Sequence, residues 1–182
     1  KGIKLNNKIK LMFSNTGWAL WNEELHSDKL IINTAFHALP DIPRKLANYF
    51  GCQCIVASID LKSDRTGKKY VMVDGGQTNT YRTLENWIRH CENLGAGEIF
   101  LNNIDHDGMR RGYDLAALEQ AANLTSLPLI IFGGASKSIH FQEGLDLGAS
   151  GVAAANIWHY TEMATKRVKR HLIAQGYNIR RS

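Results

Sequence analysis

Short apolar runs recur along the chain, and each ends on small or polar residues. The clearest is Val56-Ala57-Ser58-Ile59-Asp60, and similar runs occupy 99–105, 129–134 and 151–156. A continuous apolar run is typical of a buried parallel strand, and α/β folds place their chemistry at the carboxyl ends of such strands. Strand starts near residues 30, 55, 99, 129 and 151, with helical patterns between them, therefore predict a parallel sheet with right-handed crossovers.

The connecting segments carry recognisable helix and turn signals. Leu84, Trp87, Ile88, Cys91 and Leu94 fall at helical spacing, and Gly95 closes that helix. Further helices are predicted from three capping residues, Asp41, Asp114 and Ser138, and a basic helix is predicted to close the chain. The segment 68–76 predicts an excursion hairpin inside a long βα connection.

Composition limits the class of protein. The 182 residues, 44% hydrophobic and 21% charged, suit one globular domain over 1–182. No apolar stretch approaches the roughly 18–20 residues of a membrane span, and the first residues lack a signal-peptide pattern. Three cysteines without metal-ligand spacing indicate a reducing cytoplasm. We therefore expect no membrane association, no metal and no cofactor.

The net charge of +5 raises the possibility of a nucleic-acid partner. Much of the excess falls late in the chain, where the basic residues alternate with Val168 and Leu172 as on the solvated face of a helix. The segment has no aromatic stacking platform. A phosphorylated small-molecule substrate explains the charge better than nucleic acid does.

Several motifs, in one order and with matching spacing, resemble a known family. They are Asp-Lys-x-x-Ile-Asn-Thr at 28–34, Ala-Ser-Ile-Asp at 57–60, Gly-Ala-Gly-Glu-Ile at 95–99, Ile-Asp-x-Asp-Gly at 104–108, Gly-Tyr-Asp at 112–114 and Gly-Gly-Ala at 133–135. From about residue 28 to 180 the chain resembles the cyclase subunit of imidazole glycerol phosphate synthase (HisF) and its relatives in surface-polysaccharide sugar amidation.

The resemblance implies a (β/α)8 barrel of the TIM type, apparently incomplete at the N-terminus. Five strands are clear and a sixth is expected at 8–13, so about five or six of eight βα units are present. The family takes ammonia from a glutaminase partner and closes an imidazole ring on a bis-phosphorylated substrate. It uses two aspartates as general acid and base. Asp60 matches one, while the first-strand aspartate has no counterpart in this sequence.

Glycine-rich turns before helices predict where phosphate binds. Gly133 and Gly134 precede the helix that starts near Ser138, and backbone amides at such turns bind phosphate. Ala155 and Asn156 end the last strand, and barrels often use their final two βα loops for phosphate.

The resemblance places further residues around the substrate: Asn33, Thr34, Asn103, Asp107 and Gly108, with Gly75 and Gly76 in a mobile loop that covers it. There are also departures from the family. Phe132 and Asn156 stand where the histidine enzymes usually carry serine, and Asn102-Asn103 replaces a Thr-Ser pair. The substrate is therefore less well defined than the type of reaction.

At the opposite ends of the strands, Lys29 and Glu98 match two members of the charged ring that gates the family's ammonia entrance, and Asp28 and Gln53 match neighbours that face the glutaminase. Without the resemblance, Lys29 and Glu98 would be ordinary charges at the starts of strands.

His106 lies between two aspartates, which invites a metal hypothesis. Alternating loop residues rarely converge on one ion, however, and this favours a solvated loop.

Three functions remain open at this point. The chain is a cyclase supplied with ammonia by a glutaminase, either in histidine biosynthesis or in sugar amidation. Alternatively, it is a catalytically incomplete barrel that acts as an assembly partner, because open sheet edges demand another chain. The sister phosphosugar isomerase of the same pathway is a weaker alternative, and its turnover would not need ammonia.

Overall fold

A computed structural model describes residues 28–155, 157 and 163–179. The predicted strand at 8–13 and the site residue Asn156 lie outside these residues. The elements, in chain order, are β1 (Leu30–Ile32), α1 (Ala35–Ala38), α2 (Asp41–Phe50), the 3-10 helix η2 (Cys52–Cys54), β2 (Ile55–Ser63), β3 (Lys69–Val73), β4 (Thr78–Asn79), α3 (Leu84–Asn93), β5 (Glu98–Asn103), α4 (Leu115–Leu124), β6 (Leu129–Phe132), α5 (Ser138–Asp146), β7 (Gly151–Val152) and α7 (Ala164–Ala174).

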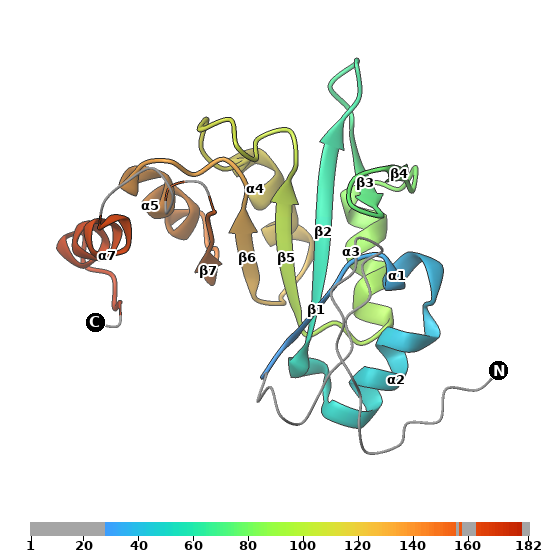
Figure 1. The fold of residues 1–182 in the computed structure, drawn as a ribbon. Coiled ribbons are helices and arrows are strands. Elements are labelled where there is room, and N and C mark those ends of the chain that lie inside the picture. Colours follow the sequence, from blue (N-terminus) through green and yellow to red (C-terminus); the bar gives the residue numbers. More distant parts are fainter. Residues whose placement is uncertain (1–27, 156, 158–162, 180–182) are drawn as a thin grey trace.

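The strands form one sheet in which β1, β2, β5, β6 and β7 are parallel neighbours in that order. Each parallel strand adds beside its predecessor in the chain, as in a barrel and unlike a doubly wound sheet. The arrowheads of β2, β5 and β6 point to the same edge, the top in Figure 1. The predicted fold class, mixed α/β with parallel βα units, is confirmed.

The predicted hairpin is also confirmed. β3 runs antiparallel to the second half of β2, with Asp60 opposite Met72 and Ser63 opposite Lys69, and β4 pairs with β3. β1 pairs with the first half of the same edge of β2, where Ile31 lies opposite Val56. One edge of β2 therefore serves two different neighbours.

The helices cover one face of the sheet, and strand side chains alternate accordingly. Figure 1 shows α3 and α4 behind the strands, and α7 beside α5 at one end. Odd-numbered residues of the central strands, such as Ile59, Leu101 and Ile131, are fully or almost fully buried against this layer. Even-numbered residues such as Asp60, Asn102 and Phe132 are half-buried on the other face.

Helix patterns identified the core correctly. In α3, Leu84, Trp87, Ile88 and Cys91 are all buried, and Trp87 is only 1% exposed. In α7, Ala164, Val168 and Leu172 are buried while the basic residues between them stay largely outside. Burying an aromatic or large aliphatic side chain contributes about 1.5–3 kcal/mol, so these stripes fix the helices onto the sheet.

Several boundaries differ from the sequence prediction. β2 does not end at Asp60 but continues to Ser63, because β3 supplies a hydrogen-bonding partner for those residues. β7 is shorter than predicted and ends at Val152. Ser138 is the first residue of α5 and its side chain makes no capping hydrogen bond, and Asp41 is likewise the first residue of α2, after Pro40.

Candidate functional site

Asp60 lies in a row of side chains that crosses three strands near their carboxyl ends. It is the register partner of Asn102 on β5, which is in turn the partner of Phe132 on β6. The Asn102 amide donates to Asp60 Oδ1 at 3.0 Å, and the Asn33 amide donates to Oδ2 at 3.4 Å. Both carboxylate oxygens therefore face amide donors, one on β5 and one just after β1.

The surroundings of Asp60 make it a weaker acid than an exposed aspartate. Burial raises the pKa of Asp60 above its ordinary 3.8, and the hydrogen bond from Asn102 opposes that shift. The negative charge of Asp107 raises the pKa further. A partly buried carboxyl group with a raised pKa is a common feature of proton-transfer sites.

A glycine-lined pocket lies beside this row. Its walls are Asp107, Gly108, Arg110, Phe132, Gly133, Gly134, Ala135, Ala154 and Ala155. Gly133 and Gly134 have φ values of 95° and 93°, which side chains strongly disfavour. A Cβ on Gly133 would lie 2.8 Å from Asn102 Oδ1. The side chain that holds Asp60 is thus also a neighbour of the pocket.

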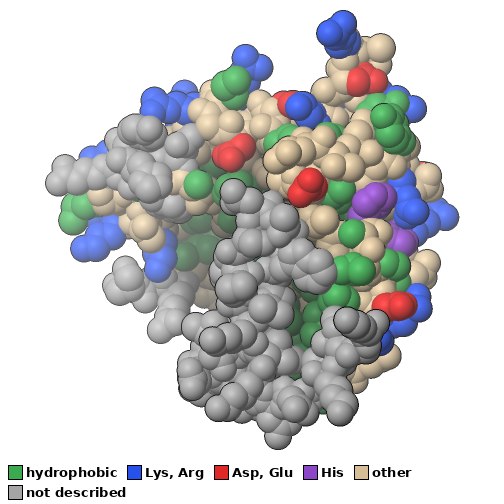
Figure 2. All heavy atoms as spheres, turned by 45° about the vertical axis from the view of Figure 1, so that its right-hand side comes forward, with side chains coloured by type: hydrophobic (Ala, Val, Ile, Leu, Met, Phe, Trp, Pro, Cys, Tyr) green, Lys and Arg blue, Asp and Glu red, His purple; other side chains and the backbone are tan. Residues whose placement is uncertain are grey.

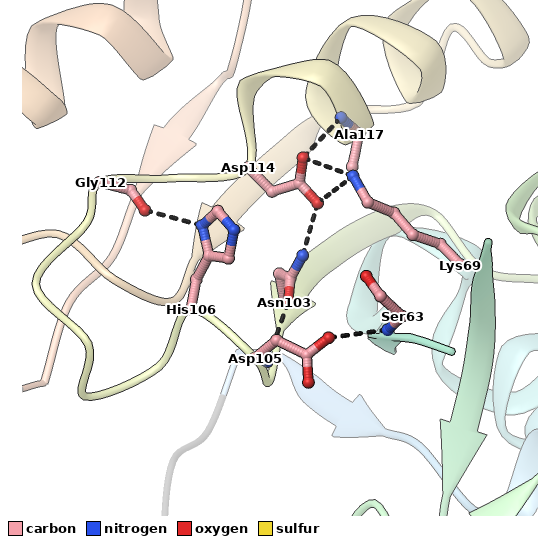
Figure 3. A network of polar contacts seen from close by, with 8 residues as sticks. All are labelled: Ser63, Lys69, Asn103, Asp105, His106, Gly112, Asp114 and Ala117. Atoms are coloured by element: carbon pink, nitrogen blue, oxygen red, sulfur yellow. Dashed lines mark hydrogen bonds and ion pairs between the residues drawn. The ribbon is translucent and has the colours of Figure 1, made fainter. Parts of the chain in front are cut away.

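The loop after β5 is braced by a polar network (Figure 3). Lys69 from β3 forms an ion pair with Asp114, whose side chain also caps α4 by accepting from the Ala117 amide. The Asn103 amide contacts Asp114 as well, and Asn103 Oδ1 accepts from the Asp105 amide at 2.9 Å.

The network fixes the orientation of the Asn103 side chain. Asn103 is 3% exposed and its side chain points to the helix side of the sheet, where both polar atoms have partners. We therefore expect Asn103 to shape the loop rather than contact the substrate with its side chain. Burial acts to raise the pKa of Asp114, but the hydrogen bonds from Lys69 and Asn103 outweigh it and lower that pKa.

The residues predicted around the rest of the substrate lie at the ends of β1 and β3. Thr34 Oγ1 accepts from the Asp74 amide at 3.0 Å, which joins the end of β1 to the hairpin. Gly75 and Gly76, in the turn before β4, both have positive φ. A Cβ on Gly76 would meet the Ile104 side chain at 3.0 Å, so the turn lies against the end of β5.

At the amino ends of the strands, two of the predicted gate residues contact each other. Lys29 and Glu98 form an ion pair between the starts of β1 and β5, with Glu98 buried and Lys29 half-exposed. Asp28 and Gln53 are exposed at the same rim. The structure thus places the four predicted gate and interface residues at the opposite rim from Asp60.

Neither a metal cluster nor a membrane-spanning helix is found among the described residues. Within 28–155 and 163–179, no group of three histidine, cysteine or acidic residues is placed to hold a metal ion. None of the helices in the described part of the chain is both long and apolar enough to cross a membrane.

Sequence reasoning missed two polar members of the site, Asn102 and Arg110. Asn102 is a departure from the family to which the motifs assigned no role, although its place two residues after Phe100 puts it on the same strand face as that residue. Arg110 belongs to a polar loop, and its backbone, with a positive φ of 59°, gave no sequence signal for a pocket wall.

The fold and this rim define the class of the molecule. It is a protein of parallel βα units in barrel order, with polar side chains and a glycine pocket gathered at the carboxyl ends of the strands. Residues 22–164 match the family of histidine biosynthesis proteins, and the chain belongs to that family.

Individual relatives agree with this assignment. The chain is 36% identical over 155 residues to the imidazole glycerol phosphate synthase subunit HisF of Streptococcus sanguinis, a match that covers 85% of this chain and 62% of the relative. It is 37% identical over 154 residues to the HisF subunit of Gluconacetobacter diazotrophicus, covering 85% and 60% respectively. The chain therefore spans about three fifths of the length of these relatives.

Proposed function

We propose that this chain carries the ammonia-dependent cyclase site of an imidazole glycerol phosphate synthase in the cytoplasm. The reaction would use ammonia from a glutaminase subunit to close an imidazole ring on a bis-phosphorylated substrate, with release of an aminoimidazole carboxamide ribotide. One observation carries the proposal: Asp60 and the glycine pocket share one rim and are separated by a single side chain, that of Asn102.

In this proposal the chemistry is divided among three groups of residues. Asp60 transfers protons at the reacting end of the substrate, and its raised pKa brings it closer to the working pH. Backbone amides at Gly133 and Gly134 hold one phosphate at the start of α5, with Asp107, Gly108, Ala155 and Asn156 completing that end. Asn33, Thr34, Gly75 and Gly76 contact the remainder of the substrate.

The direct test is turnover of the full chain with ammonium salts as the nitrogen source. Asp60→Asn is expected to lower this turnover by about 10²–10⁴-fold, because it removes one proton-transfer group. Affinity for a phosphate ligand should stay within a few fold, since the glycine pocket is unchanged. Lys166→Ala, on the exposed face of α7, serves as the control. An equally active Asp60→Asn protein would refute the assignment.

A second candidate is amidation of a surface-polysaccharide sugar by the same ammonia-using chemistry. The observation that favours it is Phe132, which lines the pocket and packs on Phe100 with ring centroids 5.4 Å apart. An aromatic ring at this place lacks the hydroxyl donor that the histidine enzymes offer to phosphate. Ammonium-dependent turnover without release of the carboxamide ribotide would favour this candidate. Glutaminase binding without turnover would instead indicate an assembly role.

A further inference from the structure

Asn102 connects the predicted proton-transfer group to the pocket wall. It lies on the face of β5 that is turned away from the helices, between its register partners Asp60 on β2 and Phe132 on β6. Its amide nitrogen donates to Asp60 Oδ1 at 3.0 Å, which is shorter than the 3.4 Å contact from Asn33 to the other oxygen. A hydrogen bond to an ionised acceptor is roughly twice as strong as one between neutral groups.

The other end of the Asn102 side chain has no such partner. Its Oδ1 is buried and accepts no hydrogen bond from the described part of the chain. It points at the space where Gly133 lacks a Cβ, which would lie only 2.8 Å away. Leaving this buried oxygen unpaired is unfavourable. Within the described residues, the hydrogen bond to Asp60 is therefore what fixes the Asn102 side chain.

The orientation of the amide matches an ionised Asp60. Turned about χ2, it would set its carbonyl oxygen against a carboxylate oxygen, which is repulsive. The observed orientation, in which the Asn102 amide nitrogen donates to Asp60 Oδ1, therefore favours the ionised carboxylate, whereas an aliphatic side chain would offer no donor.

We propose that Asn102 is a positioning residue that orients the Asp60 carboxylate and holds it in its ionised form. The effect on ionisation follows from the geometry alone, whereas its consequence for turnover rests on the proposed function. No role for Asn102 follows from the motif resemblance, because the histidine enzymes carry a different residue there.

Other groups around Asp60 would stay constant if Asn102 were replaced. Asp107, in the loop after β5, is a charged group that acts on Asp60. Asn33 follows β1 and Met72 lies on β3, and neither side chain titrates. Lys62, two residues further along the same face of β2, is exposed to solvent. A change in the ionisation of Asp60 would therefore report on Asn102 itself.

The experiment is a pH titration of the Asp60 side-chain carboxyl carbon by NMR in the full chain, with the signal identified by its loss in Asp60→Asn. Asn102→Leu is expected to raise the pKa of Asp60 by about one pH unit, since a hydrogen bond to a charged group is lost. Asn102→Thr keeps a donor and should restore most of the original value. An unchanged pKa in Asn102→Leu would overturn the proposal.

A second variant guards against a folding defect. Asn102→Ala removes the amide without added bulk and should raise the pKa in the same direction, with thermal unfolding confirming a folded chain. If Asn102→Ala titrates like the unmodified protein, the proposal is equally overturned.

Turnover separates this inference from the proposed function. The ratio of Asn102→Ala turnover to unmodified turnover, both measured with ammonium salts, should vary with pH. The reason is that the part of the pH–rate profile set by the pKa of Asp60 shifts to higher pH in the variant. The ammonia–ammonium equilibrium affects both proteins equally and cancels in the ratio. A shifted NMR titration with a pH-independent ratio would support the role of Asn102 on Asp60 but remove Asp60 from the rate-limiting chemistry. A flat ratio with an unmoved titration would reject the inference alone.

Discussion

Two aspartates of the rim, the half-buried Asp60 and the buried Asp114, have opposite electrostatic surroundings. Burial dominates at Asp60 and raises its pKa, while at Asp114 the ion pair with Lys69 and the amide of Asn103 outweigh burial. An aspartate with a raised pKa in its folded state opposes folding once it is ionised, whereas one with a lowered pKa supports folding. Asp114 therefore stabilises the loop beside the pocket, and Asp60 lowers stability where the chemistry is proposed.

This difference predicts that Asp60→Asn stabilises the protein at neutral pH. Stability linked to the protonated Asp60 is fully present below its ordinary pKa of 3.8 and is lost as pH rises through the higher folded pKa. The neutral variant avoids that loss, and the oxygen of its new amide can still accept from the Asn102 amide. We expect a gain on the order of 0.5–1 kcal/mol at pH 7 by urea denaturation, which shrinks toward pH 3.

The matched control for this prediction is Asp64→Asn in the β2–β3 turn. There the hydrogen bond from Thr66 lowers the pKa of Asp64, so the ionised Asp64 supports folding, whereas the ionised Asp60 opposes it. Asp64→Asn should not stabilise the protein at any pH. A destabilised Asp60→Asn protein at pH 7 would contradict the assignment of Asp60 as a buried carboxylate that opposes folding.

At the scale of the elements, glycines set how closely the loops after β5 and β6 approach. Gly134 has φ of 93°, and a Cβ there would lie 2.3 Å from the backbone oxygen of Gly112. The Gly112 amide donates to Gly134 O at 2.9 Å. Because the obstacle is backbone, no rotation of a side chain can relieve it, and the two loops would have to separate.

We therefore predict that Gly134→Ala opens the pocket, and Gly148→Ala is its control. Gly148, at the other end of α5, has φ of 89°, but a Cβ there would meet nothing within 4 Å. Gly148→Ala should cost about 1–2 kcal/mol from backbone strain alone. Gly134→Ala should cost more, and it should also weaken binding of inorganic phosphate in calorimetry. Equal effects of the two variants on stability and on phosphate would contradict this view of the pocket.

Most elements could be predicted from the sequence because their signals are local. The apolar runs of β2, β5 and β6 and the helical spacing in α3 mark residues that pack on the sheet. Features that depend on distant partners could not be predicted. The extension of β2 to Ser63 needs β3, and the ion pair of Lys69 with Asp114 joins residues 45 positions apart. Asn102 gained a role only when the register placed it beside Asp60.

For the whole molecule, the sheet separates two polar rims. The carboxyl rim holds Asp60 and the pocket, and the turn between β2 and β3 rises beyond it as the highest point in Figures 1 and 2, where lysine and arginine side chains are exposed. The amino rim holds the ion pair of Lys29 and Glu98. Between the two rims, the sheet face that carries Asp60, Asn102 and Phe132 is partly apolar, and Ile31 on β1 is 54% exposed there.

This separation predicts that Lys29 serves the coupling to the proposed glutaminase subunit and not the proposed proton transfer at Asp60. Lys29→Ala leaves Asp60 and the glycine pocket untouched but leaves the buried Glu98 without the lysine at the start of β1. We expect glutamine-dependent turnover, measured with a glutaminase subunit, to fall by at least about fivefold, while turnover with free ammonium stays near that of the unmodified chain.

The control for this change is Lys166→Ala, which removes an equal charge from α7, away from the amino rim. It should leave both assays unaltered, so that net charge alone is not the cause. If Lys29→Ala lowers both activities equally, the ion pair only supports the sheet. Loss of a structural contact between the starts of β1 and β5 would disturb Asp60 through Asn33, and this would lower turnover with either source of ammonia. Selective loss with glutamine would instead locate the ammonia entrance at the rim opposite the reacting groups.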